Sequence, residues 1–139
     1  MGEVKCKIGL ENSADRYLFL KKEIKETEVR RYEIDAVVDT GSVMLMLPQD
    51  VVEKLGLLIT RTVVVTYANE EREERPVATP VTIKIGDRSM NTDCIVGPPL
   101  SEPLIGQIIL EELDLIPDCQ NQVLSPRPES PIYPSLKMK

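Results

Sequence analysis

Asp39 is the residue of this sequence whose type and setting are best suited to chemistry. It opens the polar segment Asp39-Thr40-Gly41-Ser42, which follows the apolar run Ala36-Val37-Val38 and precedes an apolar run over residues 43–47. Because apolar segments flank it on both sides, we expect this carboxylate at the floor of a cleft and not at an exposed loop tip. Partial burial and nearby hydroxyl groups are what tune a carboxylate to act as an acid or a base.

The chain contains no histidine, and this narrows the chemistry further. Without histidine there is no Ser-His or Cys-His nucleophilic pair, no histidine general base and no histidine metal ligand. The three cysteines, Cys6, Cys94 and Cys119, are odd in number and widely spaced, which predicts reduced thiols. If the protein is an enzyme, we therefore expect carboxylates to supply acid and base.

Length and charge limit the domain number and the partners. With 139 residues the chain is long enough for one domain with a real core, and its few aromatic residues favour a core of Val, Ile and Leu in strands. A net charge of −6 argues against a nucleic-acid partner. No apolar run approaches the ~18 residues that cross a bilayer, and the first residues lack a signal-peptide pattern, so we expect a cytoplasmic protein without membrane contact.

The hydrophobic pattern predicts the elements that must position Asp39. From Arg31 the sequence alternates between polar and apolar residues, which predicts a strand ending at Asp39. A second strand is expected over residues 43–47, and then a helix over residues 51–55 that ends at Gly56.

The remaining segments predict a mostly β fold, a closed or folded-over barrel with one or two short helices. Further strands are expected over residues 4–8, 17–20, 62–68, 77–85, 89–96, 115–116 and 122–124, and a helix over 107–113. A polar turn at 11–15 joins the first two, and a charged tip at 69–75 closes a hairpin. Residues 1–124 thus form one domain, and residues 125–139, with four prolines, an irregular tail.

Several motifs in the same order make the sequence similar to a known family. Ala36-Val37-Val38-Asp39-Thr40-Gly41-Ser42 resembles the active-site loop of retropepsin-like aspartic peptidases, and Leu104-Ile105-Gly106 before an apolar helix resembles their second signature. The small bacterial members are resembled by Leu10-Glu11-Asn12 with Asp15, by Leu47-Pro48 with Leu55-Gly56-Leu57, and by Leu113-Asp114-Leu115. The resemblance covers roughly residues 4–126.

The resemblance implies a homodimer that cleaves a peptide or protein substrate, with one Asp39 from each chain meeting across a two-fold axis. The sequence fits, because it holds a single Asp-Thr-Gly. Aspartic proteases are the standard example of two close carboxylates that share one proton. One Asp39 would accept a proton from a water molecule while the other donates a hydrogen bond to the scissile carbonyl. The resemblance thus implies a reaction that requires no metal and no cofactor.

The resemblance also implies roles for individual residues. Thr40 would bond across the axis, Gly41 would let the substrate backbone approach, and Gly106 would allow close packing behind the loop. The hairpin over 62–85 takes the place of the substrate-covering flap. Substrate-binding roles are implied for Val37, Ser42, Tyr67, Asn69, Leu104 and Ile105.

Two departures from the family pattern stand out. The hairpin tip at 69–75 has no glycine, whereas family flap tips are often glycine-rich. Val43 and Gln107 stand where viral relatives carry an acidic residue and a paired arginine, so that ionic brace is missing.

Two functions stay open at this point. The first is a homodimeric aspartic endopeptidase, and the second is a retropepsin-like dimeric module that binds a peptide or protein partner with weak or no catalysis. Replacing Asp39 by Asn should abolish turnover in the first case and leave binding intact in the second.

Overall fold

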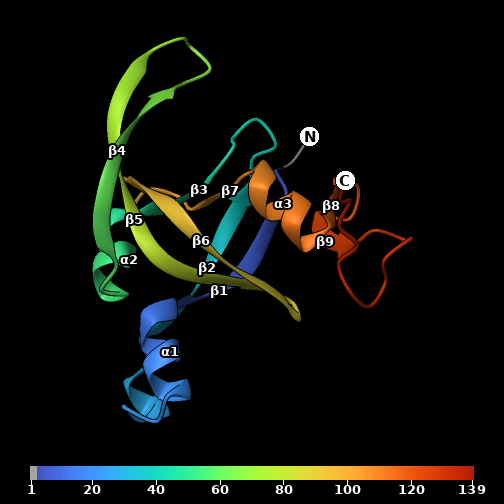
Figure 1. The fold of residues 1–139 in the computed structure, drawn as a ribbon. Coiled ribbons are helices and arrows are strands. Elements are labelled where there is room, and N and C mark those ends of the chain that lie inside the picture. Colours follow the sequence, from blue (N-terminus) through green and yellow to red (C-terminus); the bar gives the residue numbers. More distant parts are fainter. Residues whose placement is uncertain (1–2) are drawn as a thin grey trace.

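A computed structural model describes residues 3–139 and shows a mostly β chain, as predicted (Figure 1). The elements follow in the order β1 (Lys5–Asn12), α1 (Ser13–Leu20), the 3-10 helix η1 (Glu26–Glu28), β2 (Arg31–Val38), β3 (Leu45–Pro48), α2 (Gln49–Lys54), β4 (Leu58–Thr66), β5 (Arg72–Ile85), β6 (Arg88–Gly97), β7 (Leu104–Ile105), α3 (Gln107–Leu113), β8 (Leu115–Asp118) and β9 (Val123–Pro126). Three α-helices are present where one or two were expected.

Seven strands form one sheet in the order β1-β2-β7-β3-β6-β5-β4. Strand β1 also pairs with β5, so the pairings from β1 to β5 close into a ring and β4 is left as an outer strand. Strands β8 and β9 form a separate two-stranded sheet, which lies beside α3 in Figure 1.

The core is aliphatic, as the scarcity of aromatic residues predicts. Strand β5 shows the pattern: Val81, Ile83 and Ile85 are buried, whereas Lys84 between them is exposed. Leu47 and the other fully buried side chains come mainly from the sheet strands, α2 and α3. This core therefore fixes the strands whose ends carry Asp39 and the second motif.

Helix α1 replaces the strand that was predicted over residues 17–20, and that prediction is wrong. The Asn12 side chain accepts a hydrogen bond from the Asp15 amide at 3.0 Å, which caps the start of α1. The same side chain donates to the Leu55 carbonyl at 2.7 Å, beyond the end of α2. This cap outweighs the β propensity of a short run in which Tyr17 is 65% exposed.

The Asp15 carboxylate joins the start of α1 to Arg30, the residue that precedes β2. It accepts hydrogen bonds from the backbone amide of Arg30 and from two nitrogens of its guanidinium, at 2.8 to 3.0 Å. These bonds hold the pKa of Asp15 below its usual range. The chain thereby leaves β1 and returns to β2 from a fixed position, with α1 projecting from one end of the sheet (Figure 1).

The hairpin strands are longer than predicted, because the charged residues 72–75 belong to β5 and not to the tip. The expected strand over 43–47 begins only at Leu45. Gly56, at a φ of 65°, follows the end of α2 as expected.

Several residues of the segment 125–139 contact the end of α3. Strand β9 reaches Pro126, so the predicted boundary between residues 124 and 125 falls inside a strand. Beyond it, the buried carboxylate of Asp114 pairs with Arg127 and accepts hydrogen bonds from the Ser130 hydroxyl and the Ser135 amide. The buried Arg88 guanidinium donates to the Ser130 carbonyl. Within residues 3–139 the helices are all too short or too polar to cross a bilayer.

Candidate active site

Asp39 is positioned by the pairing of β2 with the short strand β7. Val37 pairs with Leu104 and Val38 with Ile105 in a parallel register. The Asp39 amide donates a hydrogen bond to the Ile105 carbonyl at 2.9 Å, which continues this ladder past the end of β2. The two sequence motifs are therefore joined through their backbones.

The Asp39 carboxylate is half-buried and is oriented by its own loop (residues 39–44, the Asp39 loop). The Gly41 amide donates to Oδ1 at 3.0 Å, and the Ser42 hydroxyl donates to Oδ2 at 2.7 Å. Each carboxylate oxygen has one donor from the loop and keeps further lone pairs for other groups.

Helix α3 supports the Asp39 loop from behind. The amides of Gln107 and Ile108 donate to the carbonyls of Ser42 and Val43 at 2.8 and 3.0 Å. These amides are among the donors that a helix leaves unpaired at its start, and the loop carbonyls satisfy them. The first turn of α3 and the Asp39 loop therefore form one hydrogen-bonded unit.

Gly106 is required for this close approach. A Cβ at this position would lie 2.7 Å from the Met44 carbonyl oxygen and 2.8 Å from that of Ser42. Both contacts are to backbone, which cannot rotate away as a flexible side chain could. The expectation that Gly106 permits close packing behind the loop is confirmed.

Gln107 has a role that the sequence did not reveal. Its side-chain Nε2 donates to the Thr40 carbonyl at 2.8 Å. The ionic brace of the viral pattern is absent here, and a neutral hydrogen bond from the first residue of α3 ties the same helix to the loop.

A cleft of about 540 Å³ opens between the Asp39 loop and β4. Its lining is mainly apolar and consists of Asp39, Gly41, Ser42, Val43, Met44, Met46, Val63, Val64, Val65, Thr66, Tyr67, Ala68, Ile95 and Leu104. Asp39 is the single carboxylate among these lining residues. An apolar trough with one acid at its floor suits an extended chain whose side chains are apolar.

The structure brings three of the six predicted substrate-binding residues to the cleft, namely Ser42, Tyr67 and Leu104. Val37 and Ile105 lie on the paired strands β2 and β7, and both side chains are buried. Asn69 lies at the hairpin tip, where its side chain accepts a hydrogen bond from the Glu71 amide. These last three residues are therefore placed in structural positions and do not line the cleft.

The structure adds lining residues that the sequence analysis did not assign. Val63, Val64 and Val65 are consecutive residues of β4 that all line the cleft, and this unbroken apolar run gave no sequence signal for which side chains would face it. Met46 and Ile95 come from adjacent strands, β3 and β6, which pair in parallel at these two residues. Their meeting depends on sheet order, which the local pattern does not encode.

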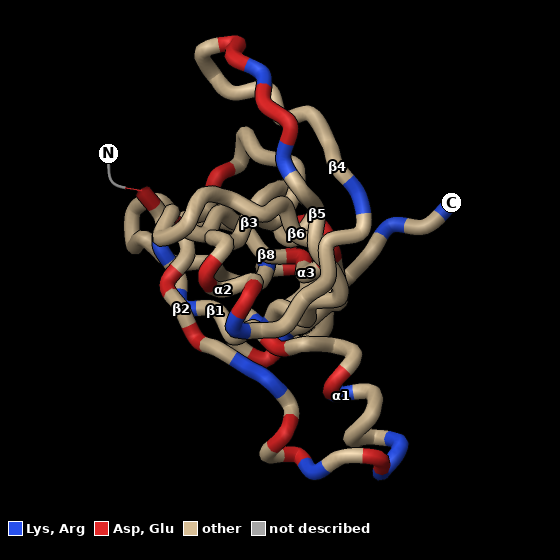
Figure 2. The backbone as a smooth tube through the Cα atoms, turned by 90° about the vertical axis from the view of Figure 1, so that its left-hand side faces the viewer, with Lys and Arg blue, Asp and Glu red and all other residues tan. Residues whose placement is uncertain are grey.

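The hairpin tip closes without glycine. Thr66 pairs with Arg72 at the end of the ladder, and Glu70 adopts the left-handed conformation with a φ of 68°. The Tyr67 amide donates to the Glu71 carbonyl at 2.9 Å. Figure 2 shows acidic and basic residues along this hairpin up to its tip.

Cys94 and Cys6 are poorly suited to nucleophilic chemistry. Burial raises the pKa of Cys94 to about 12, and burial together with the nearby Asp35 raises the pKa of Cys6. Both shifts disfavour the reactive thiolate. Among residues 3–139, His, Cys, Asp and Glu side chains nowhere gather in a group of three or more that could hold a metal ion.

A comparison with known protein families gives a match over the part of the chain that forms this site. The family model described as aspartyl protease matches residues 26–109, more than half of the chain, and this span includes both motifs. The chain belongs to the aspartyl protease family, which confirms the resemblance seen in its motifs.

Among solved structures, EIAV protease complexed with the inhibitor HBY-793 is similar to this chain. The two share 23% sequence identity with a TM-score of 0.47, over 58% of this chain and 77% of that one. A comparison with curated proteins found no match.

Proposed function

We propose that two copies of this chain form an aspartic endopeptidase in which each copy contributes Asp39. The observation that carries the proposal is the Asp39 carboxylate, held by Gly41 and Ser42 at the floor of an apolar cleft. Hydrolysis of a peptide bond by this route needs one carboxylate as base and one carboxylic acid as donor. Since one chain brings a single carboxylate to the cleft, the second must come from another copy.

The reaction follows from two Asp39 side chains that share a proton and titrate as a pair. The ionised carboxylate removes a proton from a water molecule, whose oxygen bonds to the scissile carbonyl carbon. The protonated partner hydrogen-bonds to the carbonyl oxygen as negative charge develops there. The C–N bond then breaks, the amine leaves with a proton from the dyad, and no covalent enzyme intermediate forms.

Exposed apolar side chains beside the Asp39 loop support association of two copies. Val43 is 64% exposed and Ile108 is 41% exposed, and the two residues are linked by a backbone hydrogen bond. A two-fold contact at this end of the molecule would cover both and would bring the loops together. Thr40, exposed on the same loop, is our candidate for the bond across the axis.

We also propose a cytoplasmic location. Its support is chemical, because all three cysteines are free and thiols persist in reducing compartments.

The test is hydrolysis of an unfolded protein between pH 4 and 7 by the wild-type chain and by Asp39→Asn. A hydroxyl-containing peptide analogue of the transition state should inhibit the wild type. Asp35→Asn is the matched control, since Asp35 lies on β2, the strand that leads to Asp39, and its side chain is exposed. Cleavage that Asp39→Asn abolishes and Asp35→Asn preserves supports the peptidase.

No cleavage by a folded, dimeric wild type would reject the endopeptidase. It would leave the second candidate, a dimeric module that binds a peptide or protein partner in the same cleft.

A further inference from the structure

The β4–β5 hairpin leaves the body of the protein as a free-standing ribbon. The pairing of β5 with β6 ends at Val77, opposite Ile95, whereas β4 and β5 stay paired up to Thr66 and Arg72. Residues 62–75, here called the flap arm, therefore pair only within the β4–β5 hairpin and extend beyond the sheet (Figure 1). An isolated two-stranded ribbon is only marginally stable in water, so its pose over the cleft needs further support.

Arg75 supplies a contact between the flap arm and the body. Its Nε and Nη2 donate hydrogen bonds to the Val96 carbonyl at 2.9 and 2.7 Å, and its side chain is 19% exposed. Val96 lies on β6, where it pairs with Leu47 of β3 and follows the cleft-lining Ile95. Arg75, two residues before Val77, thus holds the backbone of β6 one residue beyond the last β5–β6 pair.

Glu73 carries this contact further along the arm. Its Oε1 accepts a hydrogen bond from Arg75 Nη1 at 3.2 Å and another from the Tyr67 hydroxyl at 3.1 Å. Tyr67 lines the cleft near the tip of the arm. Partial burial and the Glu73 carboxylate raise the pKa of Tyr67, so the phenol keeps its proton and remains a donor.

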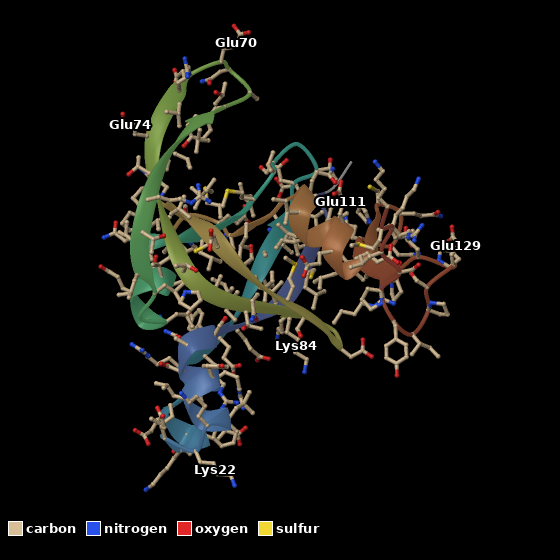
Figure 3. All side chains as sticks on the ribbon, in the orientation of Figure 1. Lys22, Glu70, Glu74, Lys84, Glu111 and Glu129 are labelled. Atoms are coloured by element: carbon tan, nitrogen blue, oxygen red, sulfur yellow. The ribbon has the colours of Figure 1, made fainter. Side chains whose placement is uncertain are left out.

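Neighbouring charges on the arm are arranged differently. Figure 3 shows Glu70 and Glu74 pointing away from the body of the molecule. Arg72 is exposed near the tip, and within residues 3–139 no ion pair or side-chain hydrogen bond links it to the body. The links from Val96 through Arg75 and Glu73 to Tyr67 are therefore specific to these residues and are not a general property of a charged hairpin.

We propose that Arg75, acting through Glu73, is a positioning residue that holds the flap arm and its Tyr67 side chain over the Asp39 cleft. Its catalytic consequence rests on the proposed function, whereas its effect on the arm does not. Without the link the arm must be ordered each time a peptide binds, and this cost weakens binding more than it slows the chemical step.

The experiment compares Arg75→Gln with Arg72→Gln, which removes the same charge from the same arm. Backbone amide hydrogen exchange over residues 62–75 is measured first, with exchange over β1 and β2 as the check that the variant is folded. Arg75→Gln should exchange about tenfold faster in the arm alone, because hydrogen bonds from a charged group are among the stronger ones. Arg72→Gln should match the wild type.

Kinetics on a peptide substrate supply the second measurement. Arg75→Gln should lower kcat/KM about tenfold, mainly through a higher KM, and Arg75→Lys should recover part of the loss. Unchanged arm exchange in Arg75→Gln, or equal effects of Arg72→Gln, would overturn the proposal. Because amide exchange requires no turnover, a chain without peptidase activity would refute the proposed function and still test this inference.

Discussion

The two sides of the cleft, the Asp39 loop and the flap arm, are supported in different ways. On the floor, carbonyls of the Asp39 loop at Thr40, Ser42 and Val43 all accept hydrogen bonds from the start of α3. On the opposite side, the flap arm pairs only within its own hairpin. Its contact with an inner strand is the pair of hydrogen bonds from Arg75 to the Val96 carbonyl. The Asp39 loop, which forms the floor of the cleft, is thus fixed by several hydrogen bonds to α3. The flap arm, which covers the cleft, is held to the body by only a few.

This difference fits the tasks of the two walls. Groups that act on a reacting bond must be held within a fraction of an ångström, and they are best placed on rigid, hydrogen-bonded elements. A cover must open to admit a substrate chain and close again, so few bonds to the body are an advantage.

The largest effect is expected from a side chain added behind the floor. Gly106→Ala places a Cβ against the backbone of residues 42–44, so the loop must move away from α3. We expect a loss of about 3 kcal/mol in the free energy of unfolding, with loss of activity. Urea unfolding measures the first and substrate hydrolysis the second.

Gly9→Ala is the matched control for that variant. A Cβ on Gly9 would meet the Lys84 Cβ at 3.7 Å, an ordinary van der Waals contact. Its stability should stay close to that of the wild type. Equal stabilities of the two alanine variants would mean that the floor is more yielding than described.

A smaller effect is expected at the side-chain brace of the floor. Gln107→Ala removes the hydrogen bond to the Thr40 carbonyl and should cost about 1 kcal/mol of unfolding free energy. Gln49→Ala is the control, because Gln49 is also the first residue of a helix but only reaches Glu53 at 3.5 Å on the surface. Chemical denaturation should separate the two variants, and identical curves would contradict a bracing role for Gln107.

An effect confined to acid pH is expected at the far end of α3. Arg127, Ser130 and the Ser135 amide hold the pKa of Asp114 well below its usual range. A carboxyl whose pKa is lowered on folding stabilises the folded state above its unfolded pKa of about 4 and loses this contribution as pH falls. Between pH 4 and pH 2 the wild type should therefore lose stability more steeply than Asp114→Asn. Parallel pH profiles of the two proteins would refute this role.

The sequence predicted the elements that carry the Asp39 loop well, and it predicted the long-range contacts that support the fold and the flap arm poorly. Strand β2 and helix α3 were predicted because alternation, the Asp-Thr-Gly-Ser segment and the apolar helix pattern are local signals. The bounds 107–113 match α3 as observed. The close packing at Gly106 could be anticipated because two motifs of a known family order the same loop and helix.

The missed features depend on partners far away in the chain. Asn12 caps α1 while it donates to Leu55, 43 residues later. The local pattern at 17–20 does not contain this contact, and it therefore favoured a strand. The Arg75 contact with Val96 spans 21 residues and requires knowledge of where β6 ends relative to β5. Val37 was assigned to the cleft from the family resemblance, and the structure buries it where β2 pairs with β7.

The most direct test of the central claim is to mix wild-type chains with Asp39→Asn chains and co-refold them. If each active site needs Asp39 from two copies, an equal mixture places about half of the wild-type chains in inactive heterodimers. Activity per wild-type chain should then fall by about half, and further as the variant is added in excess. Activity per wild-type chain that stays constant at every mixing ratio would show that one chain is sufficient and would contradict the shared dyad.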